Sequence, residues 1–105
     1  MTLITLGVMV GGAMIESFAC AETEKIFRGQ MARRLPPDIQ RTARRKLLQL
    51  HAATQLPDLA VPPGNRLEAL KGGRAGQHSV RINDQWRICF RWKSGAQAVE
   101  IVDYH

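Results

Sequence analysis

The stretch WRICFRW, from Trp86 to Trp92, constrains the fold more than any other part of the sequence. Large apolar side chains alternate there with Arg87, Cys89 and Arg91, and this period of two is that of a β-strand with two different faces. The bulky side chains at positions 86, 88, 90 and 92 all point to one side. The chain must therefore form a sheet with one face covered by other apolar residues.

A predicted helix that starts at Leu35-Pro36-Pro37-Asp38 supplies this cover. Proline is tolerated in the first turn of a helix, and an aspartate there complements the helix dipole. The residues after it repeat at intervals of three and four, which keeps them on one helical face. They are Ile39, Ala43, Leu47, Leu50 and Thr54, whereas Arg41, Arg44, Arg45 and Gln49 take the other side.

The remaining elements follow from glycine, proline and alternating residues. We expect a short strand at 15–18, a first helix at 22–28 that stops at Gly29, a rigid linker at 61–65, strands at 67–70, 77–83 and 98–104, a glycine-rich loop at 71–76, and turns at 83–85 and 93–96. This order predicts an α+β fold in which two N-terminal helices pack on one face of a small antiparallel β-sheet.

Charge and size limit the possible partners. The 105 residues suit one domain, and 15 Lys and Arg against 9 Asp and Glu give a net charge of +6. Such an excess favours a polyanion such as nucleic acid, although an acidic protein fits equally well. Cys20 and Cys89 form no metal-binding or disulfide pattern, which indicates a reducing, cytoplasmic setting.

The first stretch, MTLITLGVMVGGA, is treated apart from the fold. It has no charge, is too short to span a bilayer, and lacks the basic start of a secretory signal. Met14 then opens a segment that reads like a true start. We therefore expect residues 1–13 to be an extension or a mis-assigned start, and residues 14–105 to form the single domain.

The face opposite the large apolar residues carries the candidate chemistry. Arg87 and Arg91 lie on it, and the glycine-rich loop adds Lys71 and Arg74. Cleavage of RNA without a metal requires a base for the 2′-hydroxyl, cations for the phosphate and an acid for the leaving oxygen. The possible proton-transfer residues are Glu68, Asp103, Tyr104 and His105. The same pattern also describes arginines that are merely solvated, and residues at a frayed chain end. His51 and His78 lack clustered partners, and no metal site or cofactor is predicted.

Three motifs together resemble the HigB toxins, the plasmid-maintenance killer branch of the RelE/ParE toxin superfamily. They are LKG followed by a basic loop, the strand INDQWRICF, and the terminal DYH. The resemblance extends from MIESFACAETEKIFRGQ to the C-terminus, and covers essentially 14–105. It implies a RelE-like fold and a toxin that cleaves mRNA in the ribosomal A site. It also implies a HigA-type helix-turn-helix antitoxin, which binds operator DNA together with the toxin, and no membrane partner.

The resemblance also implies roles for individual residues. Lys71, Arg74 and Arg87 match the phosphate-contacting and transition-state-stabilising residues of the family, and Asp103, Tyr104 and His105 match its acid, base and positioning residues. Arg91 is added from the strand pattern alone. Some family members have histidine where this chain has Glu68, so either Glu68 is the base or His105 and Tyr104 take over the role.

Two other functions are compatible with the sequence. A ParE-like toxin shares the fold but inhibits DNA gyrase without a nuclease centre, and a basic nucleic-acid-binding module needs no chemistry at all. The terminal Tyr104-His105 and the LKG loop argue against the ParE-like toxin, and a cleavage assay separates the binding module from a nuclease. Arg41, Arg44 and Arg45 are compatible with ribosomal RNA, with acidic residues of an antitoxin, or with solvent.

Overall fold

The computed structural model describes residues 14–104, so the predicted extension at 1–13 and the candidate His105 lie outside the described residues. Two helices, α1 (Ala21–Phe27) and α2 (Pro37–Ala52), precede the sheet in the chain. Three short 3₁₀ helices follow in the connections: η2 (Leu56–Ala60), η3 (Pro63–Asn65) and η4 (Gly72–Arg74).

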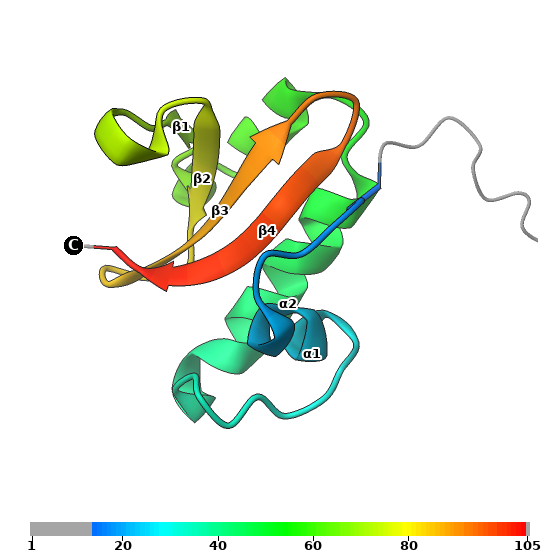
Figure 1. Cartoon of the computed structure of the whole chain (residues 1–105), viewed down its shortest axis with the longest axis vertical. Helices are drawn as coiled ribbons and strands as arrows, with labels where there is room; N and C mark the ends of the chain where they lie inside the picture. The colour runs from blue at the N-terminus through cyan, green and yellow to red at the C-terminus, as the bar shows by residue number, and fades with distance from the viewer. Residues whose placement is uncertain (1–13, 105) are drawn as a thin grey trace, which may run out of the picture.

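The sheet is an antiparallel meander whose strands lie in chain order. Its members are β1 (Glu68–Ala69), β2 (Gln77–Arg81), β3 (Trp86–Trp92) and β4 (Ala96–Asp103). In Figure 1, α2 passes behind the sheet and α1 lies next to α2, so one face is covered and the other points to the viewer. The predicted α+β class and helix-covered sheet are confirmed.

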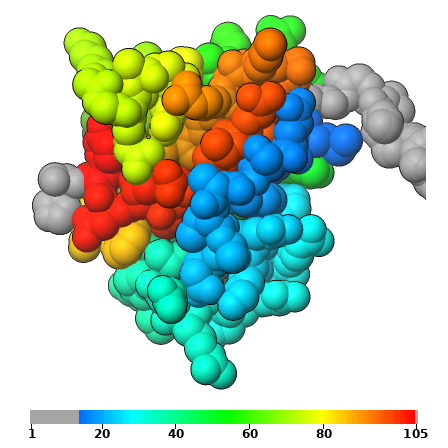
Figure 2. Space-filling model, viewed as in Figure 1, coloured from blue at the N-terminus to red at the C-terminus, as the bar shows by residue number. Residues whose placement is uncertain are grey.

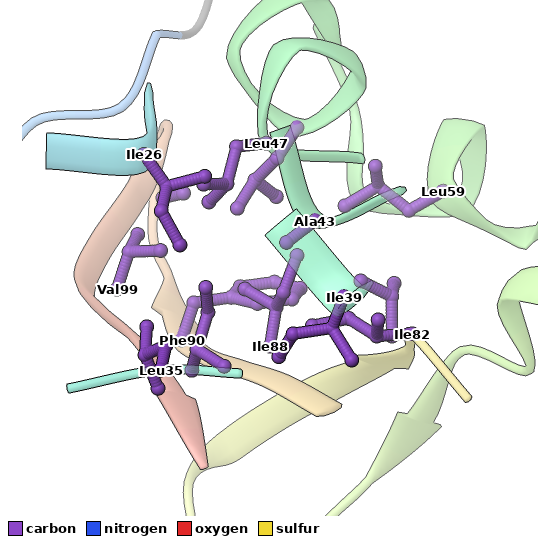
Figure 3. Packing of buried hydrophobic residues seen from close by; sticks show 14 of the residues in the cluster. Ile26, Leu35, Ile39, Ala43, Leu47, Leu59, Ile82, Ile88, Phe90 and Val99 are labelled. Atoms are coloured by element: carbon purple, nitrogen blue, oxygen red, sulfur yellow. The ribbon is translucent and has the colours of Figure 1, made fainter. Parts of the chain in front are cut away.

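The core lies between α2 and the covered face of the sheet. Ile88 and Phe90 of β3 are fully buried there, and Trp86 and Trp92 pack against the same cluster. Figure 3 shows Ile88 and Phe90 facing the stripe of α2 that was predicted from the spacing of its apolar residues. The fully or nearly fully buried helix residues are Ile26, Ile39, Ala43, Leu47 and Leu50.

Two predictions near the helices are wrong in detail. The stripe of α2 stops at Leu50, because the helix ends at Ala52, and exposed Thr54 instead donates its N–H and hydroxyl to the Asp58 carboxylate. Residues 15–18 do not form a strand; only Phe18 makes an isolated parallel bridge, to Val99.

The N-terminal segment nevertheless lies along the outer edge of β4. The Glu16 N–H donates to the Ala96 carbonyl, and the Ala19 N–H donates to the Val99 carbonyl. The pairing of this segment with β4 is interrupted because β4 contains a bulge. Cys89 of β3 pairs with Glu100 of β4, but Arg91 pairs with Gln97. A regular ladder cannot continue past such an irregularity.

Candidate active site

Cross-strand register places the candidate residues in rows on the face of the sheet opposite α2. Ser79 of β2 pairs with Glu68 on one side and with Cys89 on the other, and Cys89 pairs in turn with Glu100. Residues directly opposite each other on neighbouring strands share a face. The next row joins Arg81, Arg87 and Val102.

Arg87 is the most firmly held side chain on this face. Its Nε donates to the Ser79 Oγ at 2.7 Å, and its Nη2 donates to the backbone carbonyl of Arg66 at 2.6 Å. The same Nη2 lies 3.3 Å from the Glu68 Oε1, and the residue is only 8% exposed. Its guanidinium group is therefore fixed in one orientation, as a preorganised anion-binding group requires.

Tyr104 follows β4 and lies against this arginine. Its N–H donates to the Gln85 carbonyl at 2.6 Å, which anchors the chain end to the turn between β2 and β3. The Arg87 Cζ lies 5.9 Å from the centroid of the tyrosine ring, within the range of a cation–π contact. The side chain is 36% exposed, so its phenol is accessible to a ligand that contacts Arg87.

A second arginine–carboxylate pair lies in the adjoining row. Arg74 Nη1 is 3.2 Å from the Glu100 Oε1 and donates to the Gln77 Oε1 at 3.0 Å. Figure 2 shows the yellow-green atoms that follow β1 beside the red C-terminal end of the chain. The glycine-rich loop and the chain end thus border the same surface.

Arg91 and Lys71 are exposed at the margin of this face. A Cβ at Gly76 would lie 2.8 Å from the Arg91 Nη1, and Gly76 has a φ of +92°. The positive φ favours glycine at that position, whereas the exposed end of the Arg91 side chain could move aside. Neither Arg91 nor Lys71 forms an ion pair with a carboxylate among residues 14–104.

Asp103 lies on the other side of the sheet from Arg87. Its register partner is Trp86, whose ring packs against the core, and its Oδ2 accepts a hydrogen bond from the Gln85 Nε2 at 2.9 Å. The structure therefore brings Glu68 and Tyr104 each into contact with Arg87, and the Arg74–Glu100 pair lies on the same face. It does not bring Asp103 into this group.

Carboxylates lie among the cations of this face. Glu68 and Glu100 each pair with an arginine, and Ser79 and Cys89 are completely buried beneath these groups. Sequence analysis missed Ser79, Glu100 and the Arg66 carbonyl as partners. The period of two in β2 already contained a signal for Ser79, since Val80 and Ile82 point to the core.

The comparison with protein families decides the class. Residues 16–105 match the model for the RelE-like toxin of the type II toxin–antitoxin system HigB. The chain belongs to this HigB toxin family. A type II toxin of this family acts together with an antitoxin, so this HigB-like toxin has an antitoxin partner.

Two relatives extend the comparison. The HigB-like toxin is 41% identical over 73 residues to Toxin HigB-1 of Vibrio cholerae, a match that covers 70% of this chain and 77% of the relative. It is 29% identical over 66 residues to an uncharacterised protein of Haemophilus influenzae, covering 63% of this chain and 65% of that protein.

Two buried titratable groups of the HigB-like toxin border the site. Burial raises the pKa of the Cys89 thiol above 9.0, so the thiolate is scarce at neutral pH and Cys89 is a packing residue. Burial, followed by repulsion from Arg45, Arg81 and Arg87, lowers the pKa of Lys46 below 10.5. Its Nζ donates to the Arg81 carbonyl and adds positive charge beneath the site.

Residues 14–104 contain no group of three or more His, Cys, Asp or Glu side chains arranged to hold a metal ion. Within the same residues, neither helix has the length and apolar character needed to cross a membrane.

Proposed function

We propose that this toxin is a metal-independent endoribonuclease that cleaves mRNA in the ribosomal A site, and that a HigA-type helix-turn-helix antitoxin neutralises it. The observation that carries the proposal is that Arg87 contacts both the Glu68 carboxylate and the Tyr104 ring. A fixed cation flanked by a proton acceptor and a proton donor is the arrangement that RNA cleavage without a metal requires. Because mRNA and ribosomes are its targets, the toxin acts in the cytoplasm.

The proposed reaction assigns one proton transfer to each of these groups. Glu68 takes the proton of the 2′-hydroxyl, and the 2′-oxygen attacks the phosphorus. Arg87 stabilises the added negative charge on the phosphate oxygens. The bond to the 5′-oxygen breaks as Tyr104 or His105 donates a proton to it, which leaves a 2′,3′-cyclic phosphate and a free 5′-hydroxyl.

The other candidate residues have supporting roles in this proposal. Lys71, Arg74 and Arg91 border the face and contact neighbouring phosphates of the RNA backbone. Asp103 acts as a positioning residue, since Gln85 binds both the Asp103 carboxylate and the Tyr104 N–H and so holds the chain end in place. The ribosome holds the mRNA in the orientation for attack, which supplies a large part of the rate enhancement.

The test is to express residues 14–105 from an inducible promoter and to map the 5′ ends of cellular mRNA. We expect translation to stop and new 5′-hydroxyl ends to appear within codons at the A site. Intact mRNA together with gyrase-dependent DNA breaks would contradict the proposal and indicate a ParE-like activity. Growth that continues normally while the toxin accumulates as folded protein would indicate a binding module without catalysis.

A further inference from the structure

A groove of about 740 Å³ lies between the outer side of α2 and the segment that connects α1 to α2. Arg41, Arg44, Arg45 and Leu48 line it from α2, at helical positions i, i+3, i+4 and i+7. Such positions form one stripe on a helix. This stripe points away from the one that covers the sheet, so α2 has a second, unpartnered face.

The floor of the groove is apolar and accessible. Met31 is 67% exposed and Leu48 is 41% exposed, and both belong to the small set of large hydrophobic residues that are exposed in the described chain. Buried Ile26 of α1 lies at the base. Large apolar side chains that gather in one depression, rather than scatter over the surface, indicate a contact with another protein.

The rim of the groove carries only positive charge. Arg41, Arg44 and Arg45 form no ion pair with any carboxylate among residues 14–104, in contrast to Arg74 and Arg87 on the sheet. No aspartate or glutamate is among the residues that line the groove. Guanidinium groups that lie this close to one another repel, and an acidic partner relieves the repulsion.

We propose that this groove binds an acidic amphipathic helix of the antitoxin. Its apolar side chains fill the space above Met31 and Leu48, and its carboxylates pair with the three arginines of the rim. Recognition of an amphipathic helix by an apolar groove is a common mode of peptide binding. The apolar floor favours a protein over RNA, because a phosphate backbone has no apolar stripe to place against methionine and leucine side chains.

The proposal requires only that the toxin has an antitoxin, and the HigA type that we propose above is the partner to be used. It also separates two surfaces of the molecule. The groove belongs to the helix layer, whereas Arg87 lies on the face of the sheet that points away from that layer (Figure 1). Variants of the groove therefore leave the proposed catalytic residues unchanged.

The experiment is a calorimetric titration of full-length toxin with the purified antitoxin encoded beside the toxin gene. Each toxin carries Tyr104→Phe so that it can be produced. We compare Leu48→Asp and Arg44→Glu with Lys93→Glu. The Lys93→Glu control makes the same charge change as Arg44→Glu, at an exposed turn residue outside the groove. We expect the groove variants to raise Kd by about tenfold or more, and the control to change it by less than about twofold.

Thermal unfolding establishes that each variant is folded. If Arg44→Glu does not fold, Arg44→Gln replaces it in the titration. Antitoxin binding unchanged in the folded groove variants would overturn the proposal. Unchanged antitoxin binding with weaker binding to ribosomes would also overturn it, and would assign the groove to RNA. A failure of the proposed nuclease activity appears instead in the mapping of mRNA ends, and leaves this titration unaffected.

Discussion

The Arg87 guanidinium carbon lies 5.9 Å from the centre of the Tyr104 ring, so a central strand contacts the C-terminal end of the chain. Chain ends usually fray unless something holds them. Here the Tyr104 N–H and the Asp103 carboxylate both bind Gln85 in the turn before β3. Asp103 and Tyr104 are therefore held against the turn before β3, and a residue in proton transfer requires such a fixed position.

Replacement of Tyr104 by phenylalanine tests the phenol without disturbing this arrangement. The ring and its contact with Arg87 remain, and no hydrogen bond of the hydroxyl is present among the described residues. We expect cleavage of ribosome-bound mRNA to fall by about 10²–10⁴-fold, since general acid catalysis contributes that much. Primer extension measures cleavage, and thermal unfolding should show an unchanged Tm. Wild-type cleavage by the variant would exclude the phenol as acid or base.

Substitution of Glu68 by glutamine tests the proposed base against a matched control. Both Glu68 and Glu100 are partly exposed and pair with an arginine on the same face. We expect Glu68→Gln to lower cleavage by about 10²–10⁴-fold, because the amide cannot accept the proton of the 2′-hydroxyl. Glu100→Gln should lower it by less than about tenfold, because an exposed ion pair is worth at most about 1 kcal/mol. Equal effects of the two variants would mean that Glu68 acts only by orienting Arg87.

The structure also changes the interpretation of the activity of Arg87 variants. From the sequence, Arg87→Ala is expected to reduce cutting by orders of magnitude and leave the fold intact. The observed Arg87 is buried and donates to Ser79 and to the Arg66 carbonyl, so alanine leaves the buried Ser79 hydroxyl without this partner at a cost of about 1–3 kcal/mol. Loss of activity in Arg87→Ala therefore mixes catalysis with stability. Tyr104→Phe and Glu68→Gln are the cleaner tests.

The fold was predictable where local pattern and burial agree. WRICFRW fixed the two faces of β3, and the spacing from Ile39 to Leu50 fixed the buried stripe of α2, because each period matches one geometry. The prediction of a strand at 15–18 was wrong because this segment lies along β4, and its pairing therefore depends on residues near the other end of the chain. The bulge in β4 interrupts its pairing, and nothing within residues 15–18 reveals that bulge.

The candidate site was predictable in its residue types but not in its pairings. Alternation along β3 placed Arg87 opposite the core, and the family motif pointed to the chain end. The contacts of Arg87 with Glu68, Ser79 and the Arg66 carbonyl join segments that are distant in sequence. They depend on the register of β1 against β2, which a two-residue strand does not specify.

Lys46 gives a prediction on pH and stability. Burial lowers its pKa in the folded chain below the value of 10.5 in the unfolded chain. Between these two pKa values the unfolded state binds more protons, so the stability contributed by this residue rises with pH. Below that interval its destabilising effect is constant. We expect the free energy of unfolding of wild type, relative to Lys46→Met, to increase as pH rises from 8 towards 10.5. Urea unfolding of both proteins at several pH values measures this difference. Free energies of unfolding that change with pH in parallel for the two proteins would contradict the prediction.

Ala98 in the β4 bulge gives the last prediction. Cys89 pairs with Glu100 and Arg91 with Gln97, which leaves Ala98 and Val99 opposite Phe90, and Ala98 has a φ of +51°. A left-handed conformation costs an alanine about 1–2 kcal/mol, whereas glycine adopts it freely but loses about 0.4–1 kcal/mol more backbone entropy. We expect Ala98→Gly to stabilise the fold by about 0.5–1 kcal/mol and to raise Tm in thermal unfolding. Ala96→Gly is the control, because Ala96 is buried in the same strand without a positive φ, and it should lower Tm. A lower Tm for both variants would show that the Ala98 methyl group contributes more than its backbone conformation costs.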